Sequence, residues 1–99
     1  MGHQFTKEEK ELFEAIMSLS SEAECAAFFE DIGTIKELQD LSQRLEVAQM
    51  LSDGRNYQDV SRTTGASTAT ISRVNKCLNY GSEGYTAVLS KLQQSEVTS

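Results

Sequence analysis

Residues 65 to 74, GASTATISRV, combine small hydroxylated side chains with a single arginine. Hydroxyl groups can contact phosphates and base edges, and the guanidinium of Arg73 can pair with a phosphate. These side chains are poor material for a hydrophobic core, because buried hydroxyls and charges need partners. The segment therefore has the chemistry of a nucleic-acid contact, provided that it lies on an exposed helix.

The flanking residues predict such a helix. Asn56 can cap a short helix from 57 to about 64, Gly65 breaks it, and Ser67 can cap a second helix from 68 to about 78. Two short helices joined by a glycine turn form a helix-turn-helix candidate, although such pairs also occur in purely structural bundles. Four apolar residues can hold the pair together: Val60, Ala66, Ile71 and Val74.

Small side chains let a helix sit deep in the major groove of DNA, which is about 12 Å wide. We therefore expect groove contacts from Thr68, Ala69, Thr70 and Ser72. Gln58 on the first helix is a candidate base reader, because glutamine can pair bidentately with adenine. Contacts to the DNA backbone are expected from Arg62, Arg73 and Lys76.

The rest of the chain is also predicted to be helical. Three [ST]xxE capping boxes begin at Thr6, Ser21 and Thr34, and apolar residues recur after each at intervals of three and four. Gly33 stands where a left-handed C-cap is expected, and the third helix should end at residues 53–54. No segment alternates with period two for long enough to form a strand, so the fold class is all-α.

The chain length is typical of one domain, residues 1–99. Within it we expect a helical dimerisation core at 6–53, the helix-turn-helix at 56–79 and a C-terminal helix at 82–93 capped near Ser82. No apolar run reaches the roughly 20 residues of a membrane span, and the acid-rich start resembles no signal peptide. A cytoplasmic protein without a membrane partner is expected.

The net charge of −6 by itself argues against binding to nucleic acid, but the charge is unevenly distributed along the chain. Residues 1–53 carry 4 basic and 12 acidic side chains, residues 54–80 carry 4 basic and 1 acidic, and residues 81–99 carry 1 basic and 2 acidic. The helix-turn-helix segment is therefore locally positive, by +3. A Debye length of about 8 Å limits how far the acidic half is felt at physiological salt.

Catalytic and metal sites are not indicated. The single histidine, His3, has no companion ligands, and Cys25 and Cys77 belong to no CxxC or Cys/His cluster. No glycine-rich phosphate loop, activated nucleophile or carboxylate pair is present. The sequence thus predicts no enzyme, no metal and two reduced thiols.

The stretch "GASTATISR", preceded by "SQRLEVAQMLSDG", resembles the Trp repressor superfamily, in particular its Trp-repressor-like YerC/YecD type. The resemblance covers roughly residues 30–92. It implies an intertwined all-helical homodimer with free helix-turn-helix heads, and hence a palindromic operator. Dimerisation is also a physical expectation, because the N-terminal apolar stripes offer more surface than one 99-residue chain readily covers.

The resemblance also implies an effector site. Arg44 and Arg73 match the two arginines that sandwich the family's tryptophan, and Thr34 matches the threonine that reaches its carboxylate from the partner chain. Val74 replaces a glycine and Cys77 replaces a serine, and both changes argue against tryptophan itself. A different small anionic or aromatic effector, or no effector, remains open. Arg44 could instead form a surface ion pair on its own helix, and Arg73 could simply contact phosphate.

These features favour a sequence-specific DNA-binding transcriptional regulator, with repression expected. The alternative is a helical protein–protein interaction module of the transcription machinery, in which the acidic half is the docking surface. Salt dependence separates the two, because neutralising phosphates releases counterions.

Overall fold

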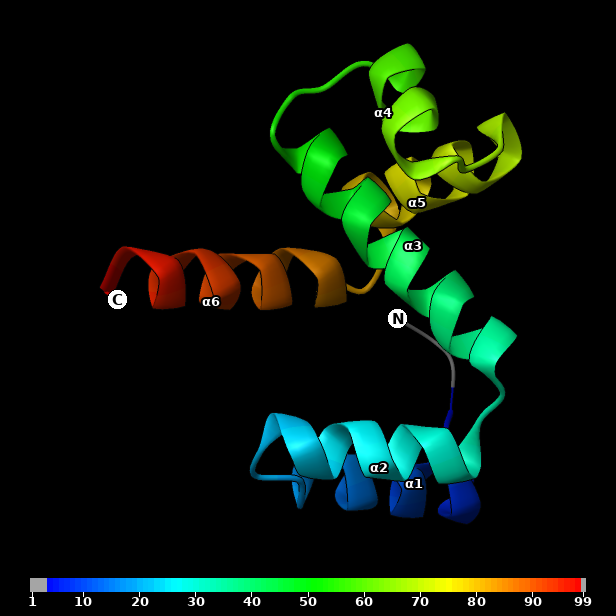
Figure 1. The fold of residues 1–99 in the computed structure, drawn as a ribbon, viewed down its shortest axis with the longest axis vertical. Coiled ribbons are helices and arrows are strands. Elements are labelled where there is room, and N and C mark those ends of the chain that lie inside the picture. The colour runs from blue at the N-terminus through cyan, green and yellow to red at the C-terminus, as the bar shows by residue number, and fades with distance from the viewer. Residues whose placement is uncertain (1–3, 99) are drawn as a thin grey trace. The chain divides into compact units, whose positions relative to one another are not determined.

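The computed structural model describes residues 4–98, of which 95–98 by the backbone alone, and all regular secondary structure in this range is α-helical. The helices in this range are α1 (Lys7–Met17), α2 (Glu22–Ile32), α3 (Ile35–Ser52), α4 (Tyr57–Thr64), α5 (Thr68–Tyr80) and α6 (Gly84–Thr98) (Figure 1). The all-α prediction is confirmed. The chain divides into two units, Met1–Gln39 and Asp40–Ser99, and α3 begins in the first and continues in the second.

In the first unit, reciprocal capping boxes start α1 and α3. The Oγ1 of Thr6 accepts the N–H of Glu9 at 3.0 Å, and the Glu9 carboxylate accepts the N–H of Thr6 at 2.8 Å. Thr34 and Glu37 repeat this arrangement with the same two distances. Each box satisfies backbone donors that the first helical turn leaves without a partner, as the sequence predicted.

Two local predictions in this unit are wrong in detail. Ser21 caps α2 through the N–H of Glu24 at 3.1 Å, but the Glu24 carboxylate accepts hydrogen bonds from Ser20, so the box is incomplete. Gly33 ends α2 with extended angles, φ −120° and ψ 177°, rather than left-handed ones. The physical reason is that α3 begins only two residues later, and an extended residue redirects the chain in that short space.

None of the described side chains in residues 4–39 is buried. Two aromatic pairs, Phe5 with Phe13 and Phe28 with Phe29, pack edge to face with ring centroids 5.0 and 5.6 Å apart. Large apolar side chains elsewhere are open to solvent, and Met17 is 83% exposed. Apolar surface of this extent on short amphipathic helices is typical of an interaction surface.

The second unit contains the hydrophobic core. Every helix of this unit contributes, through Val47, Ala48, Met50, Val60, Ala66, Ile71, Val74 and Leu89. The four apolar residues predicted to hold α4 and α5 together are all in this core and are at most 2% exposed. Because α3, α4, α5 and α6 share one core, the orientation of α5 is set by packing on several sides.

The C-terminal helices extend further than predicted. The helix α5 continues to Tyr80, and α6 begins at Gly84 instead of near Ser82 and runs to Thr98. The carbonyl of Glu83 accepts the N–H of Ala87 at 3.0 Å, and Glu83 itself has a positive φ of 67°. Glu83, and not Ser82, is therefore the residue from which the helical hydrogen bonds start.

The left-handed turn between α4 and α5 provides a stability test. Gly65 has φ +75°, and a Cβ there would meet no atom within 4 Å. Gly65→Ala is expected to cost about 1–2 kcal/mol, because only the backbone conformation opposes the substitution. Urea unfolding followed by circular dichroism measures the loss.

The matched control is Gly84→Ala at the start of α6, where a Cβ also has open space but φ is not positive. There the change should be neutral or stabilising by up to about 1 kcal/mol, since alanine favours helix. Equal effects at both positions would contradict the assigned strain.

Candidate nucleic-acid interface

The helix α4 has a defined start and stop. The Oδ1 of Asn56 accepts the N–H of Asp59 at 2.9 Å, which caps the first turn. At the other end the N–H of Gly65 donates to the carbonyl of Ser61 at 2.8 Å, and Gly65 adopts the left-handed conformation. The predicted bounds of this helix and the predicted roles of Asn56 and Gly65 are confirmed.

The turn after α4 is held by side chains. The hydroxyl of Thr64 donates to the carbonyl of Val60 at 2.7 Å and accepts the N–H of Ala66 at 3.1 Å. The hydroxyl of Ser61 donates to the carbonyl of Ala66, and the Nε2 of Gln43 in α3 donates to the carbonyl of Thr64, both at 3.1 Å. These partly buried bonds satisfy the turn backbone and fix the path from α4 into α5.

The helix α5 buries one face and exposes the other. Ser67 caps it by accepting the N–H of Thr70 at 3.1 Å, and Ile71 and Val74 are each 1% exposed. The predicted outward residues are exposed: Thr68, Ala69, Ser72, Arg73 and Lys76. Thr70 differs from the other expected groove residues, because it is half-buried and its hydroxyl accepts a hydrogen bond from Ser67.

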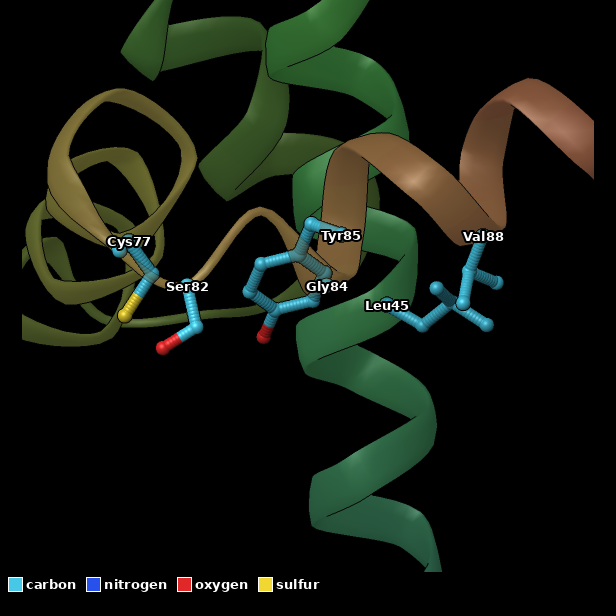
Figure 2. Close-up of a pocket in the computed structure, with 7 residues that line it drawn as sticks. Leu45, Cys77, Ser82, Gly84, Tyr85 and Val88 are labelled. Carbon is cyan, nitrogen blue, oxygen red and sulfur yellow. The ribbon is translucent and has the colours of Figure 1, made fainter. Parts of the chain in front are cut away.

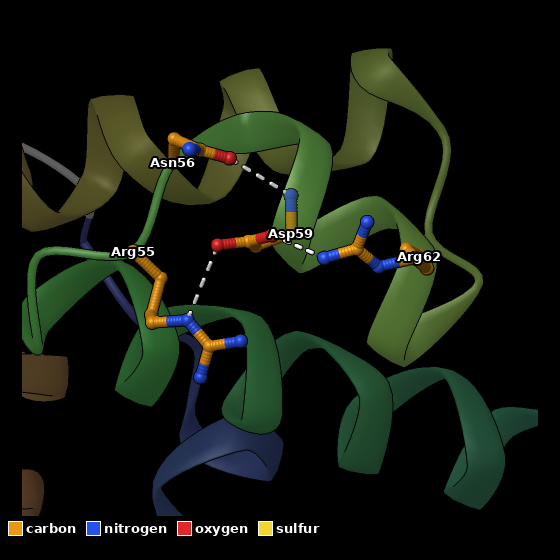
Figure 3. Close-up of polar contacts among 4 residues, drawn as sticks. All are labelled: Arg55, Asn56, Asp59 and Arg62. Carbon is orange, nitrogen blue, oxygen red and sulfur yellow. Dashed lines mark hydrogen bonds and ion pairs between the residues drawn. The ribbon is translucent and has the colours of Figure 1, made fainter.

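Two arginines, one before α4 and one on it, flank a single carboxylate of α4 (Figure 3). The side chain of Arg62 is 76% exposed and is hydrogen-bonded to the Oδ1 of Asp59. The Nε of Arg55 lies 3.6 Å from the Oδ2 of the same carboxylate. Gln58, the candidate base reader, is exposed. Sequence reasoning assigned no role to Arg55, although its spacing of four from Asp59 was a usable signal.

The residues implied by the effector resemblance lie in different settings. Thr34 belongs to the first unit and caps α3, while Arg44, Arg73, Val74 and Cys77 belong to the second. Arg44 is half-buried, and Arg73 and Cys77 are exposed. The side chain of Val74 is part of the hydrophobic core, at the position where the resemblance implies a glycine.

Cys77 borders a hollow of about 510 Å³ between α3, the end of α5 and the start of α6 (Figure 2). The other lining residues are Leu45, Gly81, Ser82, Gly84, Tyr85 and Val88. Figure 2 shows the Cys77 sulfur and the hydroxyls of Ser82 and Tyr85 on one side of this hollow. The described residues around it carry no formal charge, so its chemistry suits an apolar surface better than an anion.

The described residues offer neither a metal site nor a membrane span. No cluster of three or more His, Cys, Asp or Glu side chains there could hold a metal ion. No helix within residues 4–98 is both long and apolar enough to cross a membrane. Cys25 and Cys77 are free thiols, and His3 lies outside the described residues.

The sequence profile of the Trp repressor protein matches residues 7–93. The chain belongs to the Trp repressor family. Its relatives include YerC of Bacillus subtilis (strain 168), a protein described as uncharacterized, which is 50% identical over 93 residues that cover 94% of this chain and 89% of YerC. The predicted family, including its YerC type, is therefore confirmed.

Solved structures of similar proteins have the same fold. A Trp-repressor-like protein from Eubacterium eligens is 53% identical with a TM-score of 0.86, over 89% of this chain and 91% of that one. A candidate Trp repressor from Staphylococcus aureus is 44% identical with a TM-score of 0.87, over 90% and 89% of the two chains. The Trp-repressor-like helical fold is thus confirmed.

The hydrogen bond from Gln43 to the turn is testable in this Trp repressor family member. Gln43→Ala leaves the partly buried carbonyl of Thr64 without that donor and should destabilise the protein by about 1–2 kcal/mol in urea unfolding. Gln49→Ala is the control, because Gln49 is exposed on the same helix. A loss of equal size for the two variants would show that the bond contributes nothing specific.

Proposed function

We propose that this protein is a homodimeric transcriptional regulator, with repression as the expected mode, that binds a palindromic DNA operator through α4 and α5. The observation that supports it most is the exposed face of α5. That face carries small and basic side chains, while the opposite face is buried in the core. Proteins of the Trp repressor family are regulators, so no catalytic role is proposed.

In this proposal α5 enters the major groove. Thr68, Ala69 and Ser72 are small enough to let the helix approach the base edges, with Thr70 beside them in the first turn. Methyl groups of threonine and alanine would meet thymine methyls, and hydroxyls would meet base edges or phosphates. Arg73, one turn further along, would bind the DNA backbone together with Lys76.

The helix α4 would cross the DNA backbone beside α5, as first helices of such motifs do. Exposed Gln58 is the proposed base reader, and Arg62 is the proposed phosphate contact. The local charge of +3 in residues 54–80 supports this assignment despite the acidic remainder of the chain. A DNA-binding role agrees with the expected cytoplasmic location.

The proposed dimer would use the helical core at 6–53. Its support is the exposed apolar surface, which includes Met17 at 83%, Ile35 at 78% and Leu41 at 50% exposure. A two-fold dimer would place two α5 helices about 34 Å apart, one turn of DNA, which is why a palindromic operator is expected.

We further propose that DNA binding does not require tryptophan. The support is Val74, whose side chain occupies the core where the family resemblance implies a glycine. A tryptophan ring bound at this position would have to displace the packed side chain of Val74. Extra volume in a well-packed core is unfavourable. A small anionic effector that uses Thr34, Arg44 and Arg73, with Cys77 nearby, is the alternative.

The first experiment is selection of bound duplexes from a random DNA library at about 100 mM salt, with and without tryptophan. We expect a two-fold symmetric motif that is the same in both conditions. A motif recovered only with tryptophan would contradict the proposed independence. Failure to recover any motif, with only weak salt-labile binding, would favour the protein-interaction alternative.

Ser72→Glu is expected to abolish binding to the selected duplex, because the carboxylate would face the phosphates and bases. Ser90→Glu on α6 is the matched control and should keep wild-type affinity, since Ser90 is exposed but outside α4 and α5. Loss of the dimer in Ser72→Glu, measured by light scattering, would contradict the assignment of Ser72 to DNA contact.

The dimer itself predicts a mass of about 22 kDa by light scattering, twice the 11.0 kDa of the chain. The urea midpoint should also rise with protein concentration, because association stabilises the folded chain. A mass of 11 kDa with a midpoint independent of concentration would show a monomer.

A further inference from the structure

Arg55 has an ordered backbone although it lies between helices. The N–H of Arg55 donates to the carbonyl of Met50, and the N–H of Gly54 donates to the carbonyl of Leu51, both at 3.0 Å. Gly54 has φ +88°. This combination is the Schellman motif that closes the end of α3, and it fixes the position of the residue that follows the glycine.

The side chain of Arg55 is also held. Its Nε lies 3.6 Å from Asp59, whose other oxygen binds Arg62 (Figure 3). The backbone of Asp59 is in turn held by the cap from Asn56 at 2.9 Å. The two guanidinium groups thus flank one carboxylate whose own position is determined by the start of α4.

These contacts contribute little to folding stability. The side chains of Arg55, Arg62 and Asp59 are 47%, 76% and 31% exposed, and solvent-exposed ion pairs have small net free energies. The same contacts restrict two long side chains that would otherwise sample many rotamers. Their main consequence is orientation.

The orientation fits a phosphate backbone. Arg55 contacts Asp59 through Nε, and Figure 3 shows both its terminal amino groups directed away from the carboxylate. Terminal amino groups in this fork geometry can bind phosphate oxygens. Gln58 and Arg62 share one face of α4 by their spacing of four, and Arg55 pairs with the same Asp59 carboxylate as Arg62.

We propose that Arg55, just before α4, is a second phosphate contact beside Arg62, and that Asp59 is a positioning residue that presents both guanidiniums to the DNA backbone. This inference rests on the proposed DNA-binding function. The Asp59 carboxylate keeps the net charge of the three side chains at +1, which limits binding to DNA of any sequence, while the fixed arginines select the docked geometry.

Salt dependence tests the contact from Arg55. The full-length protein is titrated with the selected duplex at several salt concentrations, alongside Arg55→Gln, Arg55→Lys and Lys91→Gln. Each lost contact lowers the steepness of log K against log salt by about 0.9, so Arg55→Gln should lower it by about 1.8 in a dimer. Arg55→Lys should keep the slope and lose affinity several-fold, because ammonium lacks the fork.

Lys91→Gln, an exposed charge on α6 outside the motif, should leave the slope unchanged. If Arg55→Gln also leaves it unchanged, Arg55 does not contact phosphate and the inference is overturned, while the proposed function stands. If the wild-type protein binds neither the selected nor a random duplex in a salt-dependent way, the proposed DNA-binding function itself is contradicted.

Asp59→Asn tests the positioning role through the ratio of affinities for the selected duplex and a scrambled duplex. We expect this ratio to fall roughly 5-fold to 10-fold, because released arginines bind any backbone but must be ordered again in the specific complex. If Asp59 merely repelled DNA, its replacement by asparagine would instead raise the affinities for both duplexes equally. A purely structural role would lower the melting temperature and leave the ratio unchanged, and either result would overturn the positioning role.

Discussion

The arrangement of the second unit depends on the docking of α5 against α4 across one left-handed turn. Gly65 allows the chain to turn within the three residues between the helices, and the apolar residues on either side then meet in a shared core. Because Val60, Ile71 and Val74 are almost completely buried, rotation of α5 would expose apolar surface or open a cavity. The outward face of α5 is therefore a consequence of what its inner face must bury.

Hydrogen bonds restrict the orientation of the helices that this packing brings together. Hydrophobic contact alone is tolerant of small rotations, but the bonds from Gln43, Ser61 and Thr64 act at single carbonyl and N–H groups of the turn. The bond from Gln43 connects α3 to the turn that precedes α5, and the bonds of Ser61 and Thr64 hold that turn to α4. In the proposed dimer, the same connection would carry the spacing of the dimer core to the two DNA-contacting faces.

The two units handle their apolar residues in different ways. The second unit buries eight hydrophobic residues in one cluster, whereas no described side chain of residues 4–39 is buried. A chain of this length can bury only a limited share of its surface alone. The exposed aromatic and aliphatic side chains of α1 and α2 are thus the strongest physical argument for the proposed dimer, independent of any family resemblance.

Local interactions were predictable because they depend on neighbours in the sequence. Thr6, Thr34, Asn56 and Ser67 each cap the expected helix, since a side chain and an N–H three residues ahead meet whenever the first turn forms. Periodicity likewise identified the core residues that join α4 to α5. The all-α class followed from these same local patterns, and the family followed from the stretch "GASTATISR" with the residues before it.

Contacts that depend on the chain path could only come from the tertiary structure. Gly33 is extended because α3 starts at once, and Gln43 reaches a carbonyl 21 residues away. The sequence by itself determined where helices begin and which faces are apolar, since these properties are local. Tertiary structure decided which polar groups meet across elements, because that depends on the angles at which the helices pack.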